Sequence, residues 1–100
     1  MQVEFSKIAK KTLSENIEFL KKVWTNREIT IFLGDVKNIT DELESGNYLQ
    51  FQKSTRKTRS VLIGKNHVRM FFRKENEDKI IILLFFDMRQ DPQKINELLK

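Results

Sequence analysis

The residues best suited to chemistry in this sequence are the bases in its middle. Eight of the nineteen Lys and Arg residues lie between positions 45 and 74, and this stretch holds none of the fourteen Asp and Glu residues. Cationic groups attract phosphates and carboxylates, so the segregated charge predicts a nucleic acid or an acidic protein segment as the partner. The eight bases are Lys53, Arg56, Lys57, Arg59, Lys65, Arg69, Arg73 and Lys74.

The sequence contains few residues for thiol chemistry, metal binding or proton transfer. The chain has no Cys, which excludes disulfides and thiolate chemistry, and a single His cannot assemble a multi-histidine metal site. We therefore expect no metal and no small-molecule cofactor. The candidates for proton transfer are His67, the one imidazole, and Tyr48, the one phenol. A lone His beside a turn is more often a solvated surface residue than a catalytic base.

The length and the apolar pattern describe the scaffold that must position these residues. One hundred residues with 39% apolar content suit a single domain that spans positions 1–100. The longest apolar run, Ile80 to Phe86, is far shorter than the roughly 20 residues that span a bilayer. The first residues form no secretory hydrophobic stretch. These features predict a soluble intracellular protein that does not enter a membrane.

The N-terminal half predicts a short strand and two helices. Positions 2–5 suit a strand, and Ser6 suits the N-cap of a helix. Two sets of apolar residues then recur at helical spacing, interrupted at positions 25 and 26 and ended at positions 45 and 46. Such a pair predicts an antiparallel helical hairpin that packs its apolar stripe on a sheet. The two sets are Ala9, Leu13, Ile17, Leu20 and Trp24, then Ile29, Phe32, Leu33, Val36, Ile39 and Leu43.

The C-terminal half predicts three antiparallel strands after a loop over positions 47–54. Strands over 58–63 and 67–73 form a tight hairpin, because pairing Val61 with Met70 brings their apolar residues together. A strand over 79–87 is apolar on both faces and should be central and covered on both sides. Asp91 and Pro92 then start a short helix. The expected fold is α+β, with the order β-α-α-β-β-β and a short C-terminal helix.

The predicted register collects bases on one face of the hairpin. Side chains alternate along a strand, so bases and an aromatic ring share that face with small polar residues. Bases beside an aromatic ring suit single-stranded nucleic acid, in which phosphates meet the charges and a base stacks on the ring. The residues of this face are Arg56, Thr58, Ser60, Leu62, His67, Arg69, Phe71 and Arg73.

Three segments in this order carry a resemblance to a known family. The opening VEFSKIAKK (3–11), the hairpin VLIGKNHVRMFFR (61–73) and the closing IILLFFDMRQDP (81–92) are similar to the RelE/ParE toxins of bacterial toxin-antitoxin pairs. The resemblance covers nearly the whole chain. It implies a small cytoplasmic protein that inhibits growth and is neutralised by a cognate antitoxin protein.

The two branches of that family imply different targets. RelE-like members cleave mRNA in the ribosome without a metal, and the resemblance then makes His67, Arg69 and Arg73 the catalytic candidates. That branch commonly has Tyr or His near the C-terminal end, where this chain has residues 85–88, FFDM. The ending at Asp87, Arg89, Asp91 and Pro92 looks more like the ParE branch, which acts on DNA gyrase.

We therefore favour gyrase inhibition, with the ribonuclease as the alternative and a non-toxic nucleic-acid-binding module as a third possibility. Arg89 lies in the segment that resembles ParE, although Asp87 and Arg89 can equally pair with each other. The candidate residues for binding a target or nucleic acid are Arg56, Arg59, Lys65, Arg69, Phe71, Arg73 and Arg89.

Overall fold

The computed structural model describes residues 1–48, 50–53, 57–64 and 67–99. The predicted α+β class and the order of the predicted elements are confirmed, including the short C-terminal helix. The elements are β1 (Gln2–Phe5), α1 (Lys7–Leu20), α2 (Asn26–Glu44), β2 (Gln52–Lys53), β3 (Thr58–Leu62), β4 (Val68–Asn76), β5 (Lys79–Asp87) and α3 (Gln93–Leu98).

The described strands form one sheet in the order β1-β5-β4-β3-β2. The predicted hairpin register is confirmed, because Val61 lies opposite Met70 and β4 is antiparallel to both β3 and β5. Two features differ from the prediction. β1 pairs in parallel with β5. The helical hairpin returns the chain to the end of the sheet at which β1 begins, because the Met1 ammonium donates a hydrogen bond to the Glu44 carbonyl at the end of α2. A further strand, β2, pairs with β3 inside the predicted loop, and its two residues are too short to show a strand period.

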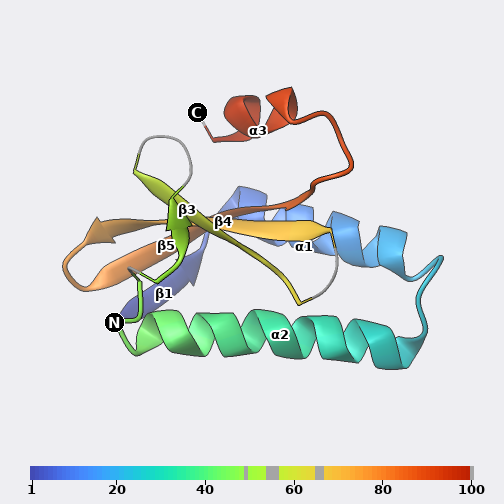
Figure 1. Cartoon of the computed structure of the whole chain (residues 1–100), viewed down its shortest axis with the longest axis horizontal. Coiled ribbons are helices and arrows are strands. Elements are labelled where there is room, and N and C mark those ends of the chain that lie inside the picture. The colour runs from blue at the N-terminus through green and yellow to red at the C-terminus, as the bar shows by residue number, and fades with distance from the viewer. Residues whose placement is uncertain (49, 54–56, 65–66, 100) are drawn as a thin grey trace.

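Side-chain caps define where the two long helices begin. Ser6 caps α1 as predicted, because its Oγ accepts a hydrogen bond from the Ala9 backbone N–H at 3.0 Å. Thr25 and Glu28 form a reciprocal capping box at the start of α2. α1 ends at Leu20, so Trp24 lies in the following turn and not in the helix, although it still packs on the core. Figure 1 shows α1 and α2 running antiparallel, as the hairpin prediction required.

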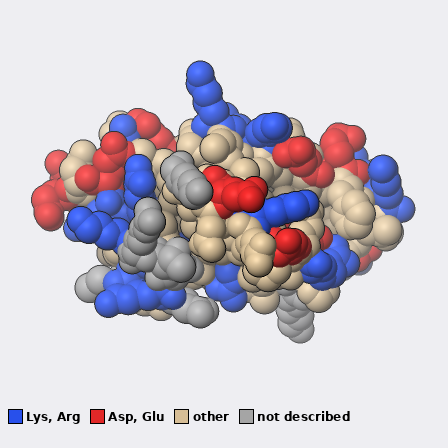
Figure 2. Space-filling model, turned by 90° about the horizontal axis from the view of Figure 1, so that it is seen from above, with Lys and Arg blue, Asp and Glu red and all other residues tan. Residues whose placement is uncertain are grey.

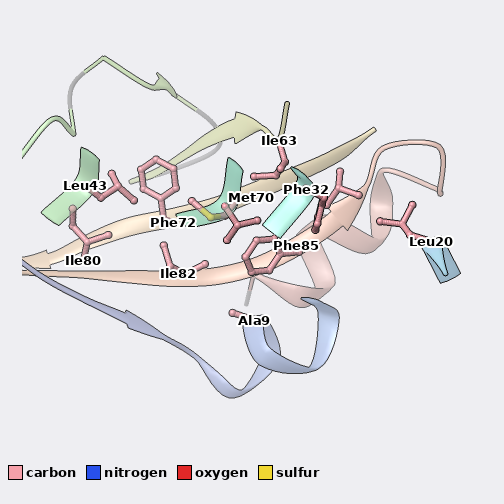
Figure 3. Packing of buried hydrophobic residues seen from close by; sticks show 12 residues of the cluster. Ala9, Leu20, Phe32, Leu43, Ile63, Met70, Phe72, Ile80, Ile82 and Phe85 are labelled. Carbon is pink, nitrogen blue, oxygen red and sulfur yellow. The ribbon is translucent and has the colours of Figure 1, made fainter. Parts of the chain in front are cut away.

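The main core lies between this helical hairpin and one face of the sheet. Figure 3 shows side chains from α1 and α2 meeting those that alternate along β4 and β5. α2 supplies four buried residues, whereas Leu33, which the periodicity placed in the stripe, is 41% exposed. Among the described helices none is long and apolar enough to cross a membrane. The buried members of the main core are Ala9, Leu20, Phe32, Val36, Leu43, Ile63, Val68, Met70, Phe72, Ile80, Ile82 and Phe85.

A second, smaller core lies on the other face of the sheet. Phe71, Leu84 and Phe86 are buried there beneath half-buried residues of α3 and its C-terminal end, Ile95, Leu98 and Leu99. A β-bulge in β5 adds Leu83 to this core. Phe71 pairs with Leu84 while Phe72 pairs with Ile82, so Leu83 is the extra residue between the two pairs, and it packs against the second core. The prediction that the strand over 79–87 is covered on both sides is therefore confirmed. Figure 1 shows α3 on the side of the sheet opposite α2.

Candidate functional site

The α3 side of β3 and β4 carries a basic face, defined here by Thr58, Ser60, Leu62, Arg69 and Arg73. The strand pairing places Leu62 opposite Arg69 and Thr58 opposite Arg73. The two arginines are four residues apart on one strand, which separates their Cα atoms by about 13 Å. None of these five residues is an Asp or Glu, but Glu75 follows Arg73 by two positions in β4. Figure 2 views the molecule from this side and shows Lys and Arg side chains gathered most densely at the lower left.

The two arginines of the basic face are held differently. Arg69 is half-buried, and its Nη1 donates a hydrogen bond to the Oγ of Ser60 at 3.1 Å, so its guanidinium is already oriented. Ser60 itself is only 1% exposed. Arg73 is exposed, and none of the described residues forms an ion pair with it. A ligand on this face would meet one pre-oriented cation and one extended cation, both able to bind phosphate or carboxylate.

Phe71 is buried. The prediction of an exposed aromatic ring between Arg69 and Arg73 is therefore wrong. Its side chain points to the predicted face, but the residue is only 4% exposed. α3 covers it, since packing three apolar residues of the sheet against three half-buried ones of the C-terminal end removes apolar surface from water. A nucleobase therefore has no ring to stack on at this position.

Arg59 lies on the opposite face, because it is one residue from Thr58 in the strand and side chains alternate. Its guanidinium carbon is 4.9 Å from the centroid of the Tyr48 ring, and its Nη1 donates to the Phe51 carbonyl at 2.9 Å. The Tyr48 hydroxyl in turn donates to the Lys57 carbonyl and accepts from the Lys74 backbone N–H. Arg59 and Tyr48 thus hold the segment before β3 against the sheet.

His67 is exposed and precedes β4 by one residue. Its carbonyl accepts a hydrogen bond from the Met88 backbone N–H at 2.8 Å. The imidazole therefore lies at the end of the hairpin that is next to the end of β5. Two further predicted site residues, Arg56 and Lys65, lie outside the described residues.

Arg89 lies away from the basic face and pairs with Asp87, one of the two roles that the sequence left open. Nε and Nη2 of Arg89 donate to the two Asp87 carboxylate oxygens at 3.0 and 2.7 Å. These hydrogen bonds lower the pKa of the Asp87 carboxyl below its ordinary value, against an opposing effect of burial. The guanidinium also lies 5.6 Å from the centroid of the Phe19 ring of α1. The pair thus ties the segment after β5 to α1.

This ion pair predicts a pH-dependent contribution to stability. Because folding lowers the pKa of Asp87 from 3.8, the contribution is complete above that value and is lost as the pH falls through the folded-state pKa. Asp87→Asn should therefore unfold at lower urea concentration than the parent at pH 7, and the difference should shrink below about pH 4. Asp91→Asn is the control, because an amide can still accept the hydrogen bond that Asp91 receives from Gln93. A difference that does not change with pH would contradict the assignment.

A groove of about 690 Å³ adjoins this ion pair. It lies between α1 and the C-terminal segment, and the end of β5 forms its floor. Sequence reasoning did not predict it. One feature of the sequence could have indicated it: Ile8 and Phe19 are apolar but do not follow the helical spacing of the buried residues of α1. They are 40% and 48% exposed. The lining residues are Ile8, Lys11, Thr12, Glu15, Asn16, Phe19, Phe85, Phe86, Asp87, Arg89, Gln90, Lys94 and Leu98.

The described candidates for binding a target thus fall into three places. Arg69 and Arg73 share the basic face with Phe71 buried beside them, Arg59 supports the sheet from the other side, and Arg89 lies at the groove. Among the described residues no cluster of three or more His, Cys, Asp and Glu could hold a metal ion. Comparison with models of known protein families found no match, and comparison with curated proteins found none either.

Proposed function

We propose that this chain is the toxin of a bacterial toxin-antitoxin pair and that it inhibits growth by binding DNA gyrase through its basic face. The observation that carries the proposal is that Arg69 and Arg73 lie on one face of an antiparallel strand pair, and that none of the five residues defining this face is an acid. Such a surface attracts an anionic partner. The element order supports the same proposal, since it is the order that the resemblance to RelE/ParE toxins implies.

Protein binding agrees better with the site than nucleic-acid chemistry does. Phe71 is buried, so the face offers no aromatic platform for a base, and Tyr48 is engaged in two hydrogen bonds on the other side of the sheet. Inhibition by binding requires no general acid or base. The cognate antitoxin, an acidic protein, would then neutralise the toxin.

A ribosome-dependent ribonuclease is the second candidate, and one observation favours it. His67 is exposed at the start of the strand that carries Arg69 two residues later, so an imidazole and a guanidinium are available at one end of the basic face. An imidazole can move a proton from the attacking 2′-hydroxyl while a guanidinium stabilises the scissile phosphate. The His67→Ala variant separates the candidates, because it should remove ribonuclease activity and leave gyrase inhibition intact.

The test is inducible expression of the chain in a bacterium, with and without the adjacent small reading frame. We expect growth to stop, plasmid supercoiling to change before protein synthesis falls, and the adjacent frame to restore growth. Early loss of translation with intact supercoiling would overturn gyrase inhibition and support the ribonuclease. Harmless expression, together with salt-dependent binding to nucleic acid, would overturn both and support a plain binding module.

A further inference from the structure

The side of α2 that faces away from the sheet is exposed along most of the helix. α2 buries four residues toward the sheet, and five residues at helical spacing lie on the opposite side. All five are exposed, and the isoleucine among them keeps 54% of its surface open to water. Figure 1 shows α2 as the outermost layer on its side of the molecule, running along the long axis. These five residues, called the outer face here, are Arg27, Ile31, Gly34, Asn38 and Asp41.

Gly34 leaves a notch in the middle of the outer face. A side-chain carbon added at Gly34 would have no atom within 4 Å, and its φ is not in the left-handed region that favours glycine. The fold of the single chain therefore does not require a glycine here, although a glycine inside a helix costs about 1 kcal/mol relative to alanine. A missing side chain allows a second backbone to approach closely at this point.

The charges of α2 and the turn before it are separated along the helix. Positions 21–30 hold three bases and one acid, and that acid, Glu28, takes part in the capping box. Positions 35–44 hold four acids and one base. That base, Lys37, donates to Oδ2 of Asp41 at 2.9 Å, and none of the described residues donates to Oδ1. A helix that is basic at its start and acidic at its end is complementary to a second copy of itself running in the opposite direction.

The positions on the outer face match the same arrangement. When two copies of α2 cross antiparallel with Gly34 on the two-fold axis, residues equally far before and after Gly34 lie at the same level. Arg27 lies seven residues before Gly34 and Asp41 seven residues after it, so each arginine meets the aspartate of the second copy. Ile31 then points into the notch beside Gly34 of the second copy, as side chains do where helices pack ridges into grooves.

We infer that the outer face of α2 is a self-association surface through which two copies of this chain form an antiparallel, two-fold symmetric dimer. One helix face from each copy is a small interface, so we expect a weak dimer with a Kd of about 1–100 µM. The inference does not rest on the proposed function, because the basic face lies on the α3 side of the sheet and stays accessible in the dimer. Failure of the dimer would leave the gyrase proposal standing, and harmless expression in the growth assay would leave the dimer standing.

Sedimentation equilibrium of the purified chain tests the inference at concentrations from about 1 to about 500 µM. The average mass should rise with concentration from 12.0 kDa, the mass of one chain, toward twice that value. The association should weaken as salt rises, because exposed ion pairs are screened. The mass of one chain at every concentration, or growth beyond the dimer, would overturn the inference.

Gly34→Glu locates the contact without harming the fold. The new side chain meets no atom of its own chain, and Glu favours helix over Gly, so the variant should unfold at the same temperature as the parent or higher. In the dimer two carboxylates would meet on the two-fold axis, which should weaken association at least about tenfold. Ser14→Glu is the control, because it makes the same change in net charge at an exposed position of α1. Equal association of the two variants would place the contact elsewhere and overturn the inference.

Exchanging the charges of Arg27 and Asp41 tests the antiparallel direction. Arg27→Asp and Asp41→Arg should each weaken association at least about tenfold, since like charges then meet at both ends of the pair. An equimolar mixture of these two variants should dimerise again, and so should the double variant, because every contact again joins an acid to a base. Circular dichroism shows whether each variant is folded. Folded variants that recover no association, neither in the mixture nor in the double variant, would contradict the pairing of Arg27 with Asp41.

Discussion

Replacing Arg69 and Arg73 together with Glu should abolish the growth inhibition that the parent chain causes. The change reverses two charges on the basic face, one of them half-buried and hydrogen-bonded to Ser60. Losing two charge-assisted contacts to an anionic partner costs about 3 kcal/mol or more, which weakens target binding at least about a hundredfold. Colony counts of an inducible strain, with and without inducer, measure the effect.

The control is the double variant Lys7→Glu, Lys10→Glu, which makes the same change in net charge on the exposed side of α1. It should remain as inhibitory as the parent. Thermal unfolding of the purified variants shows whether both are folded. If the arginine variant folds and still stops growth, the basic face does not contact the target. The main observation in support of the proposed function would then no longer apply.

Phe72→Ala should lower the free energy of unfolding by about 3–5 kcal/mol. Phe72 is fully buried in the main core, and its ring lies 5.9 Å from that of Tyr48 and 5.4 Å from that of Phe51, centroid to centroid. Removing it leaves a cavity and also removes the apolar surface on which the segment before β3 packs. Urea denaturation followed by far-ultraviolet circular dichroism measures the loss, which is a large part of the stability of a domain this size.

Leu33→Ala provides the comparison for this prediction. Leu33 is 41% exposed on α2, and Ala favours helix, so the free energy of unfolding should change by no more than about 0.5 kcal/mol. Equal losses in the two variants would contradict the assignment of Phe72 to the centre of the main core.

The strands and helices could be predicted from the sequence because the periodic burial of their apolar residues is local information. The run from Ile80 to Phe86 is apolar on both faces, and the strand it forms is covered on both faces. Pairing Val61 with Met70 was predictable since a one-residue slip would expose the apolar face of the hairpin. β2 escaped prediction because two residues show no period.

The candidate site was predictable only in part, because exposure depends on which distant element covers a face. The sequence by itself determined that Arg69, Phe71 and Arg73 share one side of a strand, since side chains alternate with period two. Only the tertiary structure decided that Phe71 is buried, because α3, more than twenty residues later in the chain, packs on it. The groove has the same origin, since its walls come from opposite ends of the chain and exist only once β5 holds α1 and the C-terminal segment side by side.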